Sequence, residues 1–142
     1  MNLYEHLKTL SKATRKTYGV TYTPQAIAKQ IVELALKEWV FDTPPRIHDY
    51  GCGTGIFLQC AVEAFRERWP SYDPLQYIAG CDIDEQAVQI ACSYGLPAHH
   101  ASMFEWATQA DIVIGNPPYV RIQNLNSLID ALLLDPPMSE EI

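Results

Sequence analysis

Residues 46 to 55 read RIHDYGCGTG, and this stretch decides the fold. Its first half, Arg46 to Tyr50, is expected to form a short strand. Three glycines follow at alternate positions, and glycine lets the backbone turn tightly and approach a ligand closely. Ile56 to Trp69 is then expected to form a helix. A strand, a glycine turn and a helix in this order predict the start of a β-α-β unit.

The same alternation continues downstream. LQYIAGCD at residues 75 to 82 predicts a second strand, and Asp84 is expected to cap a helix that runs to Tyr94, with Gly95 after it. PAHHAS at residues 97 to 102 and ADIVIGN at residues 110 to 116 predict a third and a fourth strand. The β-α-β-α-β order indicates an α/β fold with a mostly parallel, doubly wound sheet.

A helix is also expected ahead of the glycine turn, in YTPQAIAKQIVELALKEWV at residues 22 to 40. Thr23 is predicted to be its N-cap and Pro24 its first helical residue. The apolar periodicity predicts a core stripe made of Ile27, Ile31, Leu34 and Val40.

Two shorter apolar helices are expected near the ends of the chain, at residues 3 to 12 and 127 to 135. We therefore divide the chain into an N-terminal helical extension, residues 1 to 20, and the α/β domain, residues 21 to 142.

Composition indicates one domain with a modest core, since the 142 residues are 48% hydrophobic and 19% charged. The four cysteines are spaced singly, which favours reduced and mostly buried thiols in a cytoplasmic protein rather than a metal site. The N-terminus has no apolar run typical of a signal peptide, and no apolar run is long enough to span a membrane, so neither a signal peptide nor a membrane span is expected. The net charge is −7, and Arg121 is the one basic residue after Arg68. Taken by itself, the acidic character of residues 69 to 142 argues against nucleic acid as a partner.

The glycine turn and the end of the second strand together predict a nucleoside site. Asp82 lies 27 residues beyond Gly55, where a carboxylate can accept hydrogen bonds from both ribose hydroxyls. The glycine spacing differs from the dinucleotide fingerprint, and such a turn taken alone is sometimes only a tight turn. Asp84 is interpreted as a helix cap rather than a ligand.

Three motifs in chain order, DYGCGTG, GCDID and GNPPY, together resemble the class I S-adenosylmethionine-dependent methyltransferases. The preceding stretch TYGVTYTPQAIAKQIVEL and the form NPPYVR are similar to the gamma-order enzymes that methylate the N6 amine of adenine in DNA, including restriction–modification methylases. The resemblance covers about residues 17 to 125. It implies a Rossmann-like sheet of seven strands, of which four are placed here, so the domain is expected to be truncated and to lack the target-recognition domain.

The resemblance also implies S-adenosylmethionine as cofactor, and specific residues to hold it. Thr23 and Asp49 are expected at the methionine end, with the glycine loop beneath it. Asp82 is expected on the ribose, and Ile83 and Met103 against the adenine. The family offers an acid to the adenine N6 where this chain has Ser102, which can still accept one hydrogen bond. The implied cofactor residues are Thr23, Asp49, Gly51, Cys52, Gly53, Asp82, Ile83, Ser102 and Met103.

The motif NPPY is expected to carry the chemistry. The side-chain oxygen of Asn116 and the carbonyl of Pro117 can each accept a hydrogen of the target amine, which favours the pyramidal nitrogen that attacks the methyl carbon. Pro118 stiffens the turn, and Tyr119 is expected to stack on a base swung out of the duplex. An ordinary surface turn is the structural alternative.

The expected function is therefore methyl transfer to adenine N6 in DNA within a restriction–modification system. Cytosine C5 methylation is disfavoured, because no proline in the chain is followed by cysteine. An enzyme acting on a protein glutamine or on RNA, and a non-catalytic cofactor-binding fragment, stay open as alternatives. The expected partners are DNA, through the complete enzyme, and a complementary subunit or downstream domain. The chain alone is expected to form a homodimer and not to associate with membranes.

Overall fold

A computed structural model describes residues 23–106 and 108–115 of the chain. In this part the sheet has four strands: β1 (Ile47–Asp49), β2 (Ile78–Asp82), β3 (Ala98–His100) and β4 (Ile112–Val113). Their order across the sheet is β3-β2-β1-β4, and every neighbouring pair is parallel. All four predicted strands are confirmed, as is the mostly parallel α/β fold.

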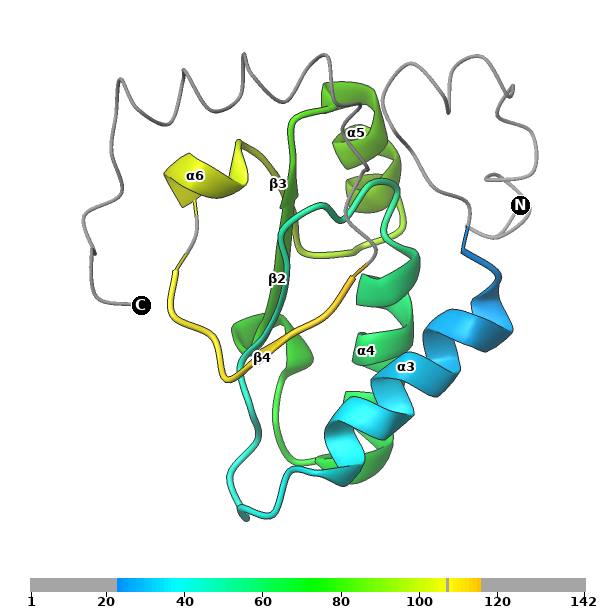
Figure 1. Ribbon diagram of the computed structural model, residues 1–142, viewed down its shortest axis with the longest axis vertical. Coiled ribbons are helices and arrows are strands. Elements are labelled where there is room, and N and C mark those ends of the chain that lie inside the picture. Colours follow the sequence, from blue (N-terminus) through cyan, green and yellow to red (C-terminus); the bar gives the residue numbers. More distant parts are fainter. Residues whose placement is uncertain (1–22, 107, 116–142) are drawn as a thin grey trace, which may run out of the picture.

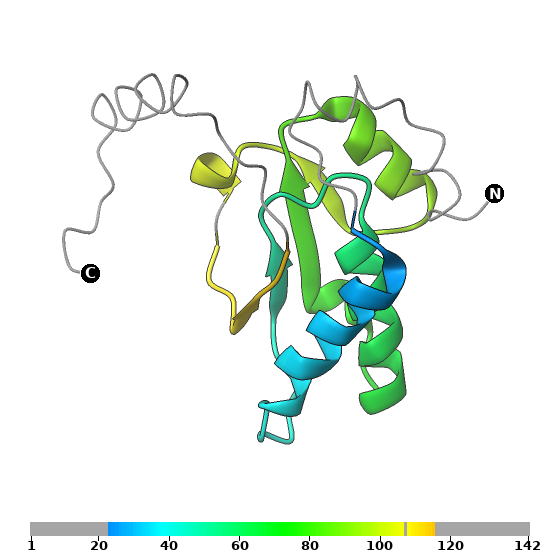
Figure 2. The ribbon, with the colours of Figure 1, turned by 45° about the vertical axis from the view of Figure 1, so that its right-hand side comes forward.

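The helices alternate with the strands along the chain. They are α3 (Gln25–Lys37), α4 (Ile56–Arg68), α5 (Glu85–Ser93) and the single turn α6 (Met103–Trp106), with a 3₁₀ turn η1 (Pro74–Gln76) before β2. Figures 1 and 2 show α3, α4 and α5 on one side of the sheet and α6 on the other. The remaining two predicted helices, at residues 3 to 12 and 127 to 135, lie outside the described residues.

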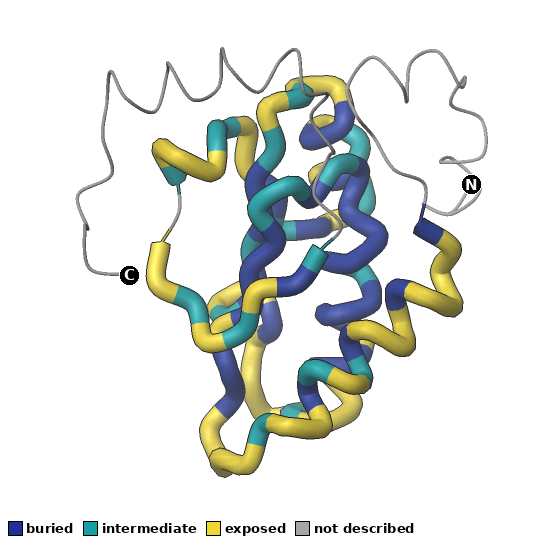
Figure 3. The backbone as a smooth tube through the Cα atoms, in the orientation of Figure 1, coloured by how far each residue is buried: buried dark blue, intermediate teal, exposed yellow. Residues whose placement is uncertain are grey.

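The hydrophobic core lies between the sheet and the helices α3, α4 and α5. Ile47 and Ile78 face it from neighbouring positions of β1 and β2, and the side chains of Leu58 and Phe65 of α4 are almost completely buried against them. Figure 3 shows this buried layer in dark blue. Burying apolar surface of this kind stabilises a fold by about 25 cal/mol per Å².

Local sequence explains where α5 begins and ends. Asp84 has an extended backbone, and its carboxylate accepts hydrogen bonds from the amides of Gln86 and Ala87. The first amides of a helix have no carbonyl partner within it, and the Asp84 carboxylate serves as the acceptor instead. Gly95 follows the helix with φ of +76°, a conformation that glycine adopts without strain. Both predictions for this helix are confirmed.

The predicted start of α3 was wrong by one residue. Pro24 and not Thr23 is the N-cap, because Pro24 has an extended ψ of 142°. The carbonyl of Pro24 accepts hydrogen bonds from the amides of Ile27 and Ala28 at 3.0 Å each.

The predicted core stripe of this helix was also wrong. Ala28, Val32 and Leu36 are buried against the rest of the core. The four residues predicted instead are between 39% and 81% exposed: Ile27, Ile31, Leu34 and Val40. Helix α3 carries two apolar faces, and periodicity alone does not tell which one meets α4.

Candidate cofactor site

The site residues gather at the carboxyl edge of the sheet. Because β1, β2 and β4 are parallel, the segments that follow them lie at the same edge, which is where open α/β sheets bind ligands. The glycine loop follows β1, Asp82 ends β2, and Gly115 follows β4.

The glycine loop turns sharply and leaves an open face. Gly53 and Gly55 have φ of +54° and +100°, which side-chain-bearing residues rarely adopt. A Cβ at Gly55 would lie 2.6 Å from Leu96 Cδ1, so glycine there lets α4 begin close to the segment after α5. A Cβ at Gly53 would meet nothing within 4 Å. The loop is therefore tightly packed on one side and accessible at Gly53.

Two carboxylates hold the loop from either side. The Gly51 amide donates to Asp49 Oδ1 at 3.1 Å, and the Gly53 amide donates to Asp82 Oδ2 at 2.8 Å. Between them, the Cys52 amide donates to the carbonyl of Cys81 at 2.9 Å. The structure thus brings together five of the predicted site residues: Asp49, Gly51, Cys52, Gly53 and Asp82.

Asp82 links the loop to the start of the next helix. Its second oxygen, Oδ1, accepts from the Asp84 amide at 2.8 Å. Each carboxylate oxygen has a further lone pair, so both can still accept a hydroxyl hydrogen. The predicted ribose contact of Asp82 is compatible with this geometry and stays a prediction.

Asp49 is a carboxylate without a cationic partner among the described residues. Its side chain is 2% exposed, and the one hydrogen bond to it from this part of the chain comes from Gly51. Gly115, with φ of +139°, lies against it, since a Cβ there would be 2.5 Å from Asp49 Oδ1. Burial raises the pKa of Asp49 to about 7, the Gly51 amide opposes this, and the charge of Asp82 adds to it. A bound cation would relieve this cost.

Apolar side chains lie exposed where the adenine is expected. Ile83 is 72% exposed, and Met103 and Phe104 are exposed on α6. The Ser102 hydroxyl accepts from the Phe104 amide at 3.2 Å, so it caps α6 and keeps one acceptor site for another group. Large apolar side chains are usually buried, and this group next to Asp82 suits a flat aromatic ligand.

Sequence reasoning missed Phe104 and His100 at this end of the site. His100 Nε2 lies 3.1 Å from the carbonyl of Ile83 and holds the loop after β2. The aromatic and histidine residues in HHASMFEW were visible in the sequence, but their positions relative to Asp82 depend on the sheet order.

The other predicted site residues are placed only in part. Thr23 is buried and directly precedes Pro24, the N-cap of α3. The residues predicted to act on the target amine lie outside the described residues and immediately follow Gly115: Asn116, Pro117, Pro118 and Tyr119.

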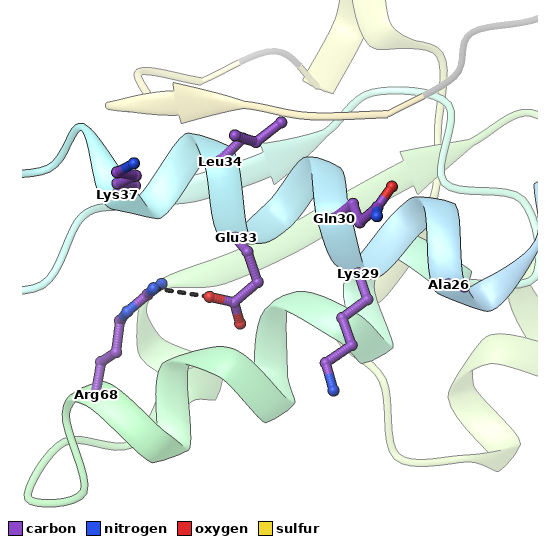
Figure 4. Close-up of a pocket in the computed structure, with 7 residues that line it drawn as sticks. All are labelled: Ala26, Lys29, Gln30, Glu33, Leu34, Lys37 and Arg68. Atoms are coloured by element: carbon purple, nitrogen blue, oxygen red, sulfur yellow. Dashed lines mark hydrogen bonds and ion pairs between the residues drawn. The ribbon is translucent and has the colours of Figure 1, made fainter.

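A separate hollow of about 680 Å³ lies along α3 and the last residue of α4 (Figure 4). Arg68 and Glu33 form an ion pair there at 2.7 Å, with both side chains more than a third exposed. The hollow is lined by Ala26, Lys29, Gln30, Glu33, Leu34, Lys37 and Arg68, none of which belongs to the glycine loop or its carboxylates. We therefore do not assign the cofactor to it.

The described residues also limit other kinds of site. They contain no group of three or more metal-ligating side chains, and none of their helices is long and apolar enough to cross a membrane. Of the four cysteines, Cys52, Cys60 and Cys81 are buried and Cys92 is exposed, and all four are free thiols.

Comparison with solved structures shows a shared fold. A type I restriction–modification methyltransferase subunit from Streptococcus thermophilus is 23% identical, with a TM-score of 0.52, over 74% of this chain and 26% of that one. A modification subunit of a putative type I restriction enzyme from Vibrio vulnificus is 19% identical, with a TM-score of 0.53, over 82% of this chain and 28% of that one. This chain thus spans roughly a quarter of those two proteins.

A putative RNA methyltransferase from Pyrococcus horikoshii has the same fold, at 21% identity and a TM-score of 0.52, over 92% of this chain and 67% of that one. None of the curated proteins searched matches the chain.

The family model for N-6 DNA Methylase matches residues 2–131, which is most of the chain and includes the glycine loop, both carboxylates and the NPPY motif. The match agrees with the resemblance carried by DYGCGTG, GCDID and GNPPY. The chain therefore belongs to the N-6 DNA Methylase family.

Proposed function

We propose that this chain binds S-adenosylmethionine at the carboxyl edge of its sheet and takes part in methyl transfer to the N6 amine of adenine in DNA, within a restriction–modification system. Family membership supports the reaction class. The observation that carries the proposal is the pair of carboxylates, Asp49 and Asp82, that holds the glycine loop from either side.

The residues present suit this cofactor. Asp49 offers a buried negative charge to the methionyl ammonium, and Asp82 offers two acceptors to the ribose. Gly53 leaves open space beside the loop, and Ile83 and Met103 offer apolar surface to the adenine. Thr23, Gly51, Cys52 and Ser102 complete the proposed set. The sulfonium of the cofactor supplies the methyl group and a good leaving group.

The role of the protein is then to hold and orient the target amine. Gly115, the residue that precedes the NPPY motif in the sequence, lies against Asp49 and therefore beside the proposed methionine end. The Asn116 side-chain oxygen and the Pro117 carbonyl accept the two amine hydrogens. Pro118 stiffens this turn, and stacking of the base on Tyr119 contributes about 1–3 kcal/mol.

The proposed partners are DNA and a further subunit or domain. That subunit or domain would supply most of the contacts to phosphates, since residues 69–142 carry Arg121 against ten acidic side chains. The cytoplasmic location and the domain boundary at residue 20 stay predictions.

Transfer of tritiated methyl groups from the cofactor tests the proposal. The chain, with its neighbouring subunit or downstream region where the genome encodes one, is incubated separately with DNA, RNA and a glutamine-containing protein substrate. We expect label in DNA, recovered as N6-methyladenine. Label in RNA or protein would favour the corresponding alternative. Cofactor binding without transfer to any of the three would favour a non-catalytic module.

A further inference from the structure

Helix α6 is too short and too exposed to hold its own position, although it begins at the residues proposed for the adenine. It consists of four residues, Met103–Trp106, and none of them is buried. It lies on the side of the sheet opposite α3, α4 and α5 (Figure 2). A single exposed turn is not stable by itself, so other contacts must fix the position of Ser102 and Met103.

The ring of Trp106, the last residue of α6, packs on three other rings on this side of the sheet. We define the aromatic cluster as His48, Tyr50, His99 and Trp106. The Trp106 ring lies 5.2 Å from the ring of His48, 6.0 Å from that of Tyr50 and 5.2 Å from that of His99, with which it is stacked. His48 and His99 come from β1 and β3, so Trp106 packs across the sheet.

Hydrogen bonds hold the chain directly after α6. The Tyr50 hydroxyl donates to the carbonyl of Thr108 at 2.7 Å. His48 Nδ1 lies 3.3 Å from that hydroxyl and 3.5 Å from Thr108 Oγ1. His48 is buried, and its burial lowers its pKa, so the ring is neutral near pH 7. The aromatic cluster therefore holds the chain on both sides of residue 107.

The segment before α6 is held to the proposed ribose site. The Ala101 amide donates to the carbonyl of Asp82 at 3.1 Å, and His100 Nε2 lies 3.1 Å from the carbonyl of Ile83. One end of the segment 101–108 is thus fixed to β2 and the other to Tyr50. Tyr50 itself lies between Asp49 and Gly51, so the same residue contacts the segment and continues into the glycine loop.

We propose that Tyr50 and Trp106 are positioning residues for the adenosine half of the cofactor site. They fix the position of Ser102 and Met103 relative to Asp82 and Ile83. Trp106 does so from the last residue of α6, and Tyr50 does so through Thr108, which follows α6. This inference rests on the proposed function, since it presupposes that the adenosine binds at Asp82. It assigns roles to Trp106, which lies outside the three motifs, and to Tyr50, which lies in DYGCGTG but is not among the residues expected to hold the cofactor.

The expected effects follow from the contacts removed. Tyr50→Phe keeps the ring and removes the hydroxyl, which bonds to the carbonyl of Thr108 and contacts His48 Nδ1. The loss of one hydrogen bond corresponds to about a threefold to tenfold change in affinity. Trp106→Phe keeps an aromatic ring but loses contact area, and Trp106→Ala loses the ring contacts altogether. We expect the loss of affinity to grow from Trp106→Phe to Trp106→Ala.

Two ligands separate positioning of the adenosine half from other effects. S-adenosylhomocysteine carries the amino acid part, and 5′-methylthioadenosine lacks it. Calorimetric titration of the full chain should show that Tyr50→Phe and Trp106→Phe weaken both ligands by a similar factor. Asp49→Asn should weaken S-adenosylhomocysteine alone, because only that ligand has an ammonium group.

The chain offers matched controls in a second group of rings at the other end of the sheet. Trp69 and Tyr77 pack on Phe65 with ring centroids 5.2 Å and 5.4 Å away. Trp69→Phe and Tyr77→Phe are the same changes made away from the proposed site. They should lower the melting temperature to a similar degree and leave both dissociation constants unchanged.

Two results would overturn the inference: unchanged affinity of Tyr50→Phe and Trp106→Phe for both ligands, or an equal loss in the two control variants. If Trp106→Ala does not fold, the two conservative variants still decide the question. If the unaltered chain binds neither ligand, the proposed function fails, and that outcome is distinct from unchanged affinity in the variants.

Discussion

At the scale of single residues, the two carboxylates beside the glycine loop have different environments. Asp49 is buried and accepts one hydrogen bond from the described residues, whereas Asp82 is partly exposed and accepts two, one on each oxygen. Desolvation penalises the charged form of the first more strongly. The buried carboxylate therefore suits a cationic group, and the partly exposed one suits hydroxyl groups.

We predict that Asp49 makes the stability of the ligand-free chain depend on pH. The pKa of Asp49 is raised from 3.8 to about 7 in the folded chain. Its contribution to the free energy of unfolding is therefore greatest below pH 4 and is lost as the pH rises through about 7. The shift corresponds to on the order of 4 kcal/mol across that range. Urea denaturation at several pH values should show this slope in the unaltered chain and not in Asp49→Asn. Equal slopes in both proteins would contradict the assignment of a buried acid that has no cationic partner among the described residues.

Asn116 is predicted to act on the target amine and not on the cofactor. Asn116→Ala in the active enzyme should lower methyl transfer by orders of magnitude, since the interaction it removes forms in the transition state. The dissociation constant of the cofactor should stay within about twofold, because by the proposal the Asn116 oxygen acts on the target amine. Single-turnover kinetics and calorimetry measure the two effects separately. Near-normal turnover would remove Asn116 from the proposed machinery.

At the scale of elements, signals close together in the sequence predicted structure best. The glycine turn fixed the junction of β1 and α4, and Asp84 with Gly95 fixed both ends of α5, because each depends on a few neighbouring residues. The buried face of α3 was mispredicted, because it depends on which side α4 contacts. The contact of Tyr50 with Thr108 joins residues 58 positions apart, and no local pattern predicts it.

Helix α3 provides a direct test of which of its apolar faces supports the fold. Leu36 is 3% exposed and Leu34 is 65% exposed, two residues apart on the same helix. Leu36→Ala should lower the free energy of unfolding by about 2–4 kcal/mol, because it leaves a cavity in the core. Leu34→Ala should change it by less than about 0.5 kcal/mol. Chemical denaturation of both variants checks this, and similar losses in the two would mean that α3 packs through both faces.

At the scale of the whole molecule, β1 lies inside the sheet, and β4 is at one edge of the four described strands. The carboxyl ends of β1, β2 and β4 thus bring Asp49, Asp82 and Gly115 to one place. The alternation of strands and helices predicted the fold class, a mostly parallel α/β sheet. It did not predict that Gly115 lies against Asp49. This placement follows from the pairing of β4 with β1, which no local sequence pattern predicts.

The position of β4 at the edge of the described strands leads us to predict that the 142-residue chain self-associates. Within the described residues β4 pairs only with β1, Val113 is exposed, and α3 has its second apolar face exposed in Ile27, Ile31 and Leu34. Open strand edges and apolar surface favour association. Sedimentation velocity at tens of micromolar should therefore show a dimer. A single monomeric species at that concentration would refute the prediction.

The most direct test of the central claim is a calorimetric titration of S-adenosylmethionine into the unaltered chain, Asp82→Ala and Asp84→Ala. Asp82 contributes charge-assisted hydrogen bonds to the glycine loop and, by the proposal, to the ribose, whereas Asp84 only caps α5. We expect binding by the unaltered chain, at least tenfold weaker binding by Asp82→Ala, and unchanged affinity with a lower melting temperature in Asp84→Ala. Absence of binding to the unaltered chain, or unchanged affinity in Asp82→Ala, would contradict a cofactor site at the carboxyl edge of the sheet.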